Sequence, residues 1–333
     1  MKTRIAVIAC LLCGILAAGS AALEGQKKIV FKTATNNPKL SGHYKGMQIF
    51  KQLVEERTNG AVEVELYSDA VLGDEEQMAE GLKMGVLDMY IASAAKYANF
   101  VPEMDIYSPP YTFASWDHVK KVLQSDVNKK LEKLVFDKRG DYYVGCLTDG
   151  VRNIFTRAEY PGLDSLKGIK LRTMTGPIET VSFKALGMNP TPMAYTEVYS
   201  ALQTGVIDGA ENSMTSLLSM KFFESCKFVL RTEHCFLVLP MIISGKSIKK
   251  LPEEYREIVL QAGRETCLQQ IDWAIAYDKD NENALIQKYG VKVTDMTPAD
   301  KARAQEMVAN VQLDNAKRLN MVSEMEAIRT MAE

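Results

Sequence analysis

The sequence predicts an α/β protein built from two similar lobes. From residue 28 onward, segments that alternate like strands and segments with helical periodicity follow one another, as in parallel α/β units. Two helix ends far apart in the chain share one pattern, L-K-M-G-V-L-D at 82–88 and L-Q-T-G-V-I-D at 202–208. The length of 333 residues also suits about two domains.

The first lobe begins with a strand, a helix and a strand. Residues 28–35 and 62–67 alternate like strands, and residues 42–57 between them are helix-periodic. A second helix is expected over 74–84, because acidic residues fill its first turn and Gly85 can form a left-handed cap. These elements form the first parallel α/β unit.

The repeated helix end indicates where a cleft lies. The first copy runs into an apolar strand at 89–92 and reaches Ser93, and the second copy reaches Asn212. Loops at element ends are common places for ligand-binding side chains. If the two lobes are built alike, we expect Ser93 and Asn212 to face each other across a cleft between the lobes.

The middle of the chain continues the alternation. A helix is expected over 116–138 with Ser115 as its N-cap, and a strand follows at 142–147. An apolar strand at 238–243 comes after the second copy of the repeat. This order suggests that the chain crosses back from the second lobe to the first.

Two long helical segments close the chain. Pro252 opens a helical pattern that reaches Tyr289, followed by Gly290. Such a helix is long for one lobe, so we expect it to brace both. Residues 299–332 form a final helical region, with breaks that the pattern does not locate.

The N-terminus has the pattern of a secretory signal peptide. Lys2 and Arg4 precede an apolar run at 5–18, and small residues follow up to Ala22. The run is shorter than the roughly 20 residues that span a bilayer, which disfavours a membrane anchor. A lipid attached at Cys10 is also disfavoured, because too few residues precede it. We predict cleavage near Ala22 and an exported, periplasmic protein.

Charge and cysteine content exclude some partners and leave one question open. The net charge of −2 gives no broad affinity for nucleic acid or for an anionic membrane. Cys146, Cys226, Cys235 and Cys267 lie beyond the signal peptide, in a compartment that permits disulfides. Cys226 and Cys235 are the pair closest in sequence, but buried free thiols fit the same pattern.

The sequence offers no catalytic constellation. His43, His118 and His234 are the only histidines, and none stands in an H-E-x-x-H helix. No G-x-S-x-G turn presents a nucleophile and no Cys/His cluster predicts a metal. The S-G-K-S at 244–247 lacks the first glycine of a phosphate-binding loop. We therefore predict neither an enzyme nor a cofactor.

The segment from Gly168 to Asn212 carries the candidate binding chemistry. A strand is expected to end at Arg172, two helices follow, and a D-G-x-E-N turn ends at Asn212. The guanidinium of Arg172 either makes a surface ion pair of little consequence or points into the cleft and grips a carboxylate with two parallel bonds. Arg152 in G-V-R-N-I-F-T repeats the strand-associated arginine and favours a cationic pocket.

Several motifs in one order make the chain resemble the extracytoplasmic solute receptors of TRAP (tripartite ATP-independent periplasmic) transporters. They are G-V-R-N-I-F-T, L-K-G-I-K-L-R, A-L-G-M-N-P-T-P-M and E-V-Y-S-A-L-Q-T-G-V-I-D-G. The resemblance implies a type II-like periplasmic-binding-protein fold, with a ligand cleft between two lobes and a long helix bracing both. We expect a signal peptide at 1–22, lobe I at 23–149 and 238–277, and lobe II at 150–237 and 278–333.

The resemblance also implies which residues bind the ligand. In the family, the arginine of the G-x-K-x-R strand pairs with the ligand carboxylate, and that position is Arg172. The asparagine after the D-G-x-E turn is Asn212, and the further pocket cation of the G-x-R strand is Arg152. Alignment with sialic-acid receptors adds Asn36 or Asn37, Glu75, Ser93, Lys96, Thr175, Tyr195 and Glu211.

Differences from the sialic-acid receptors argue against sialic acid as the ligand. Ser93 stands where those receptors have a glutamate, and Thr175 where they have an asparagine. Lys96 adds a cation and Tyr195 an aromatic face, although a solvated lysine and a packing tyrosine fit the sequence as well. The ligand stays open among a C4-dicarboxylate, a sugar acid and an aromatic 2-oxo or 2-hydroxy acid.

We predict a monomeric receptor that closes its lobes on an organic acid and delivers it to the small and large membrane subunits of a TRAP transporter. A receptor for a sensor kinase or for an ATP-driven importer is an alternative with the same fold and a different partner. An exported enzyme acting on organic acids is a third hypothesis. It needs an activated nucleophile or an acid/base pair that the sequence does not supply.

Overall fold

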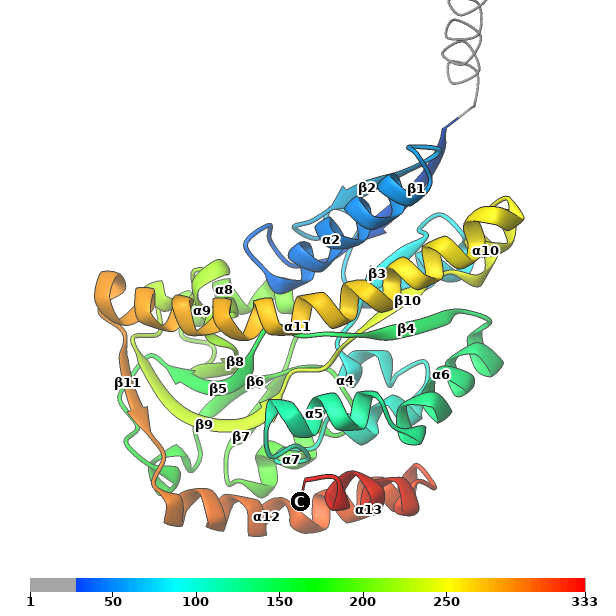
Figure 1. Cartoon of the computed structure of the whole chain (residues 1–333). Coiled ribbons are helices and arrows are strands. Elements are labelled where there is room, and N and C mark those ends of the chain that lie inside the picture. Colours follow the sequence, from blue (N-terminus) through cyan, green and yellow to red (C-terminus); the bar gives the residue numbers. More distant parts are fainter. Residues whose placement is uncertain (1–27, 333) are drawn as a thin grey trace, which may run out of the picture.

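The computed structural model describes residues 28–332 and contains two mixed sheets, one in each of two lobes (Figure 1). Helices pack on the faces of both sheets, so the predicted two-lobed α/β fold is confirmed. The predicted signal peptide and its cleavage site lie outside the described residues. Within residues 28–332, no helix combines the length and the apolar character that a membrane crossing requires.

The sheet of lobe I has the strand order β2-β1-β3-β10-β4. Its strands are β1 (Ile29–Ala34), β2 (Val62–Tyr67), β3 (Met89–Ile91), β4 (Tyr142–Leu147) and β10 (Leu239–Ile243). β1 pairs in parallel with β2 and β3, whereas β10 runs antiparallel to both β3 and β4. The chain therefore crosses back into lobe I at β10, as the sequence predicts.

The sheet of lobe II has the strand order β11-β9-β5-β8-β6-β7. Its strands are β5 (Val151–Thr156), β6 (Lys170–Thr173), β7 (Asn189–Pro192), β8 (Gly209–Asn212), β9 (Phe228–Phe236) and β11 (Lys292–Asp295). The turn expected at D-G-x-E-N is wrong, because Gly209–Asn212 is a strand that pairs with β5 and places Asn212 opposite Asn153. This segment is buried, and strand pairing satisfies its backbone groups.

The predicted helices of lobe I begin and end at capping residues. They are α2 (Gly42–Arg57) and α3 (Glu75–Met84), and a short helix that was not predicted, α4 (Ala94–Tyr97), follows without a side-chain cap. The side chain of Ser41 caps α2, and Asp74 forms a capping box with Gln77 at the start of α3. Gly85 ends α3 in the left-handed conformation, with φ of 78°.

The helix predicted over 116–138 is two helices, α5 (Trp116–Leu123) and α6 (Asp126–Arg139). The prediction of one helix is wrong because Ser125 caps a new one, its side chain accepting a hydrogen bond from the Val127 N–H. The remaining short helices are α7 (Glu179–Ala185), α8 (Val198–Thr204), α9 (Met214–Ser219) and α10 (Gly245–Lys250). Single 3₁₀ turns lie at Pro102–Tyr107, Leu163–Leu166, Tyr195–Glu197 and Phe222–Glu224.

The long helix α11 (Glu253–Tyr289) braces both lobes, as predicted. It packs against α2 and β4 in lobe I and against α9 in lobe II (Figure 1). Gly290 ends it in the left-handed conformation, with φ of 66°. Gln270 of α11 donates to the carbonyl oxygens of Gly42 and Thr148 and so fixes the helix beside the crossing between the lobes.

The final helical region breaks once, between α12 (Pro298–Arg318) and α13 (Val322–Thr330). Asn320 at the break has a positive φ of 55°. Val308 of α12 packs in a core cluster of lobe II, whereas Leu319 and Ile328 pack in a cluster with α5 and α6 of lobe I. The C-terminal segment thus touches both lobes, and the division of the chain at residue 278 stays a prediction.

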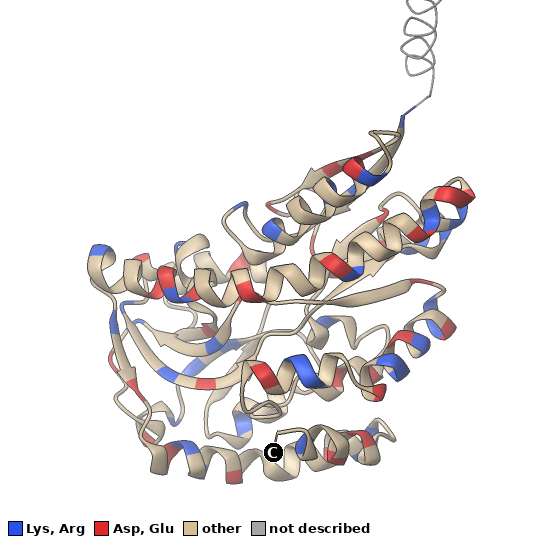
Figure 2. Ribbon diagram, in the orientation of Figure 1, with Lys and Arg blue, Asp and Glu red and all other residues tan. Residues whose placement is uncertain are grey.

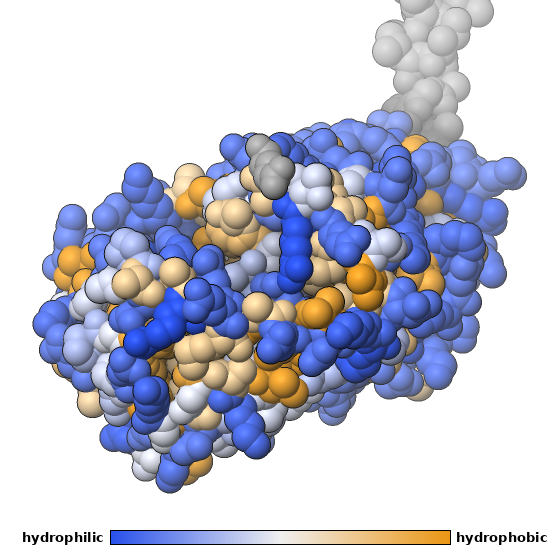
Figure 3. Space-filling model, turned by 90° about the horizontal axis from the view of Figure 1, so that it is seen from below, coloured by the Kyte–Doolittle hydropathy of each residue, from blue (hydrophilic) through white to orange (hydrophobic). Residues whose placement is uncertain are grey.

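Acidic and basic residues are mixed along several helices. Figure 2 shows them interspersed along α6, α11 and α12. On the face seen in Figure 3, apolar side chains form small groups among hydrophilic ones.

Cys146, Cys226, Cys235 and Cys267 are free thiols, so the disulfide considered between Cys226 and Cys235 is not formed. No group of side chains able to hold a metal ion occurs among these residues.

Candidate functional site

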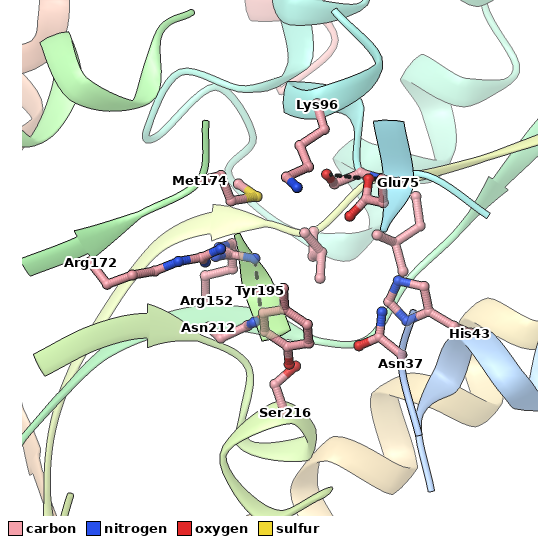
Figure 4. Close-up of a pocket in the computed structure, with 13 residues that line it drawn as sticks. Asn37, His43, Glu75, Lys96, Arg152, Arg172, Met174, Tyr195, Asn212 and Ser216 are labelled. Atoms are coloured by element: carbon pink, nitrogen blue, oxygen red, sulfur yellow. Dashed lines mark hydrogen bonds between the residues drawn. The ribbon is translucent and has the colours of Figure 1, made fainter. Parts of the chain in front are cut away.

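A pocket lies between the two sheets, where element ends of both lobes meet (Figure 4). It encloses about 370 Å³ of space between the atoms. Lobe I lines it with Asn37, His43, Glu75, Ser93, Lys96 and Leu239. Lobe II lines it with Arg152, Arg172, Met174, Tyr195, Asn212 and Ser216, and Leu237 comes from the crossing between the lobes. Ser93 and Asn212 therefore face one pocket from opposite lobes, as the repeated helix end predicts.

Arg152, on β5, is paired with a carboxylate of the neighbouring strand β8. The register of these strands sets Glu211 opposite Ile154 and Asn212 opposite Asn153. The Arg152 guanidinium donates to both carboxylate oxygens of Glu211 and, at 2.8 Å, to the Glu211 carbonyl oxygen. Its Nη1 donates to Asn212 Oδ1 at 3.1 Å. Arg152 therefore has its charge neutralised and fixes the orientation of Asn212 in the pocket.

Glu211 stays ionised although it is buried. Burial alone raises its pKa, but the charge of Arg152 and hydrogen bonds from His234 and Arg152 lower the pKa of Glu211 to about 2. His234 Nε2 lies 3.1 Å from Glu211 Oε2, and its Nδ1 lies 2.8 Å from Thr232 Oγ1. Glu211 thus sits behind the pocket, where both of its oxygens are engaged.

Arg172, on β6, is buried without a carboxylate partner among the described residues. It is 2% exposed, and burial lowers the pKa of its guanidinium. Its Nη2 donates to the Met193 carbonyl oxygen at 2.9 Å, while its Nε has no partner among residues 28–332. The guanidinium carbon lies 5.7 Å from the centre of the Tyr195 ring. A buried cation with a free donor is costly until an anion binds it.

The opposite wall comes from lobe I and contains both signs of charge. Glu75, the first residue of α3, accepts hydrogen bonds from the Ser93 N–H at 2.7 Å and the Ser93 hydroxyl at 2.9 Å. Burial raises the pKa of Glu75, and the charge of Lys96 opposes this rise. Lys96, on α4, is 3% exposed and points into the pocket near Glu75 (Figure 4). The hypothesis that Lys96 is a solvated surface lysine is therefore wrong.

Asp149 joins the two walls where the chain crosses between the lobes. Its Oδ1 accepts a hydrogen bond from the Gly42 N–H of lobe I at 2.6 Å, and its Oδ2 accepts from the Ser216 hydroxyl of lobe II at 3.2 Å. Oδ2 also lies 3.9 Å from His43 Nδ1. Burial raises the pKa of Asp149 to about 8 and lowers that of His43 to about 3. One carboxyl at the crossing between the lobes thus binds the Ser216 hydroxyl and lies beside His43.

Most of the predicted site residues line the pocket. They are Arg152, Arg172, Asn212, Glu75, Ser93, Lys96 and Tyr195. Of the alternatives Asn36 and Asn37, it is Asn37 that lines the pocket, and its Nδ2 donates to Asn36 Oδ1 at 2.8 Å. Thr175 is exposed and Glu211 lies behind the pocket, so the structure brings neither to the cavity surface. The part of each residue in ligand binding stays a prediction.

Sequence reasoning missed five lining residues. They are His43, Met174, Ser216, Leu237 and Leu239. One of them had a signal, because side chains two apart along an extended segment point to the same side, so Met174 continues the face of Arg172 where Thr175 does not. The others enter the pocket through the packing of the lobes, which no local pattern encodes.

Comparison with known proteins places the chain among solute-binding proteins. The family described as "Bacterial extracellular solute-binding protein, family 7" matches residues 33–318. A solute-binding protein of Sulfitobacter sp. (strain NAS-14.1) is 34% identical over 86% of both chains. The 2,3-diketo-L-gulonate-binding periplasmic protein of Escherichia coli is 29% identical over 80% of both. The solved TRAP periplasmic solute-binding protein from Sulfitobacter sp. NAS-14.1, with bound α-D-taluronate, superimposes with a TM-score of 0.86 at 31% identity, covering 90% of this chain and 97% of that one.

Proposed function

Because the chain belongs to family 7 of the bacterial extracellular solute-binding proteins, we propose that it captures an organic acid between its lobes and delivers it to the membrane subunits of a TRAP transporter. The family binds solutes, so the chain is a binding protein and not an enzyme. The periplasm is the compartment expected for it. One observation carries the proposal for the ligand: the guanidinium of Arg172 is buried and has no carboxylate partner among the described residues.

The two pocket arginines differ in what they leave for a ligand. Arg152 donates its hydrogen bonds to Glu211 and Asn212. Arg172 uses one donor on the Met193 carbonyl oxygen and keeps Nε free among the described residues. A guanidinium can hold a carboxylate with two parallel charge-assisted bonds, which is stronger than contact with a neutral group. Arg172 is therefore the proposed clamp, and Asn212 the neutral group beside it.

The charges around the pocket favour a ligand with a single carboxylate. Arg152 is balanced by Glu211, and Lys96 lies near Glu75 (Figure 4). Arg172 and Lys96 make no ion pair among the described residues, but the charge of Glu75 acts on Lys96, which leaves Arg172 as the proposed partner of the ligand carboxylate. A second ligand carboxylate beside Lys96 would also meet the negative charge of Glu75, and burying it against that charge costs free energy.

A sugar acid suits the neutral part of the pocket. Asn37, His43 and Ser216 offer donors and acceptors from both lobes, as the hydroxyl groups of a sugar require. Two of the similar proteins carry sugar acids in their descriptions, one 2,3-diketo-L-gulonate and the other α-D-taluronate. We therefore propose a hydroxylated monocarboxylate as the ligand.

Closure of the lobes completes the proposed mechanism. The lobe II wall presents Arg172, and the lobe I wall presents Glu75 and Lys96. A ligand bound to one wall in an open cleft draws the other wall over it by a hinge motion at the crossings between the lobes. Closure removes water and strengthens the pair between Arg172 and the carboxylate. The membrane subunits then receive the closed, loaded receptor.

A screen of organic acids tests the proposal. The purified mature protein is titrated calorimetrically with D-glucuronate, D-galactonate and succinate after a thermal-shift survey of related acids. A bound acid raises the melting temperature by mass action. We expect a sugar acid to bind more tightly than succinate and a sugar alcohol without the carboxylate not to bind. Equal binding of the sugar alcohol contradicts the Arg172 clamp, and catalytic turnover of the bound acid contradicts the assignment as a receptor.

A further inference from the structure

A second chamber adjoins the pocket. It encloses about 250 Å³ of space and shares Ser93, Met174 and Leu237 with the pocket wall. Its remaining lining is mostly apolar but includes two polar side chains that the proposed carboxylate clamp does not use, Glu179 and Ser108. The two spaces thus share a wall that includes Met174.

Glu179 is a buried carboxyl without a partner. It is the first residue of α7 and is 5% exposed, yet its side chain makes no hydrogen bond or ion pair with any of residues 28–332. Burial and the negative charge of Glu211 raise the pKa of Glu179 well above its ordinary value. Buried polar groups in folded proteins nearly always have a hydrogen-bond partner, so this carboxyl is available to bind a group from outside the protein chain.

A separate cavity in lobe I contains a carboxyl that, unlike that of Glu179, is hydrogen-bonded. It is larger, at about 530 Å³, and Glu132 and Asn128 are among its lining residues. There the Asn128 side chain donates to Glu132 and accepts from the Tyr143 hydroxyl at 2.7 Å. Glu132 and Asn128 of that cavity are hydrogen-bonded, whereas Glu179 in the second chamber is left without a bond.

We propose that the second chamber receives the end of the ligand remote from the carboxylate, and that Glu179 binds a hydroxyl group there. This inference rests on the proposed function, because Arg172 has to fix the carboxylate before the far end can be placed. A carboxyl can accept a hydrogen bond and, when protonated, also donate one, so it matches a hydroxyl group in either state. The negative charges of Glu211 and Asp105 act on Glu179 and the charges of Arg152 and Arg172 oppose them, so a hydroxyl group, which adds no charge, fits this place.

Glu179 is thus a specificity-determining residue, and the ligand class becomes narrower. The preferred ligand is a monocarboxylate that carries hydroxyl groups along a chain or ring long enough to pass Met174. A short acid that ends before Met174 gains nothing from Glu179. The alternative occupant of the chamber is an ordered water molecule bound to Glu179, which leaves selectivity unchanged.

A cycle of protein variants and ligand analogues tests the inference. The full mature protein and its Glu179→Leu and Glu179→Gln variants are titrated calorimetrically with D-galactonate and with analogues that each lack one hydroxyl group. In the wild type, we expect one analogue to bind roughly tenfold more weakly than D-galactonate. In Glu179→Leu this difference disappears, whereas Glu179→Gln retains part of it because an amide still forms a hydrogen bond. Glu132→Gln, in the separate cavity, is the matched control and keeps the wild-type pattern.

The outcomes separate this inference from the proposed function. If Arg172→Ala abolishes binding but every analogue loses the same factor in the wild type and in the Glu179 variants, the subsite is wrong and the clamp stands. If no sugar acid binds the wild type, the proposed ligand class fails and the subsite fails with it. Glu179→Gln, which preserves size and shape, gives the answer if Glu179→Leu does not fold.

Discussion

The guanidinium of Arg152 donates to both carboxylate oxygens of Glu211, and both residues are almost completely buried. Arg172 lines the same pocket without such a partner among the described residues. The Arg152–Glu211 pair forms part of the wall of the site, whereas the positive charge of Arg172 is available to a ligand. The two arginines therefore differ in what their removal costs.

Glu211→Gln is expected to destabilise the fold. It leaves Arg152 buried without its counter-charge, which costs about 3–5 kcal/mol in comparable buried pairs. Urea unfolding followed by circular dichroism measures the change. Glu159→Gln is the matched control, because its pair with Lys292 is exposed at the surface and should contribute less than about 1 kcal/mol. Equal loss in both variants contradicts the structural role of the Arg152 pair.

Arg172→Ala is expected to abolish tight ligand binding without unfolding the protein. Loss of a buried, hydrogen-bonded charge pair typically weakens binding by about 2–5 kcal/mol. The fold itself loses only the bond to the Met193 carbonyl oxygen. Calorimetric titration of the ligand and thermal unfolding of the free protein measure the two effects. Arg303→Ala, at an exposed pair on α12, is the control that should bind like the wild type.

Asp149→Asn is expected to make stability less dependent on pH. The pKa of Asp149 rises from an ordinary value of 3.8 to about 8 in the folded protein, so folding takes up a proton between these values. Stability is then greatest below the unfolded pKa and falls as pH rises towards 8, by up to about 1.4 kcal/mol per pH unit for one such group. Asparagine cannot ionise, and its oxygen can still accept from the Gly42 N–H while its amide nitrogen donates to the Ser216 hydroxyl, which reverses that bond. Unfolding free energies measured from pH 4 to pH 8 should therefore slope less in the variant, and an unchanged slope excludes Asp149 as the cause.

Gly176→Ala is expected to weaken ligand binding by obstructing the approach of the lobes. A Cβ atom on Gly176, which follows β6, meets the backbone oxygen of Ala95 in lobe I at 2.8 Å. Backbone on both sides leaves little room for adjustment, so the closed arrangement is penalised. Calorimetry should show weaker binding and X-ray scattering a larger radius in the presence of ligand. Gly81→Ala, whose added atom finds its neighbours no closer than 3.6 Å, is the control.

Local patterns in the sequence predict most of the fold because local interactions set the element ends. Asp74 with Gln77, Gly85 and Gly290 form the caps that the sequence implies. The single helix predicted over 116–138 fails for a related reason, since Ser125 is a capping residue inside an otherwise helical pattern. The D-G-x-E-N segment fails because tertiary pairing with β5 overrides its turn composition.

The candidate site was harder to predict where side-chain direction decides. Arg172 and Met174 share a face and Thr175 does not, which is a matter of strand periodicity. Glu211 has the residue type of a ligand contact, but Arg152 and His234 occupy its oxygens. Glu179 lines one chamber with Ala95 of α4 and with Ser108, and only the folded chain brings these segments together.

The distribution of the pocket side chains between the lobes has a consequence for how such receptors diversify. The arginines stand on β5 and β6 of one sheet, with β8 between them, and Glu75, Lys96 and His43 stand on helices of the other lobe. Substitutions in those helices can therefore change which acid is preferred while the anchor for its carboxylate persists. New ligand preferences can then arise through substitutions in lobe I alone. No intermediate form has to lose the binding of the ligand carboxylate.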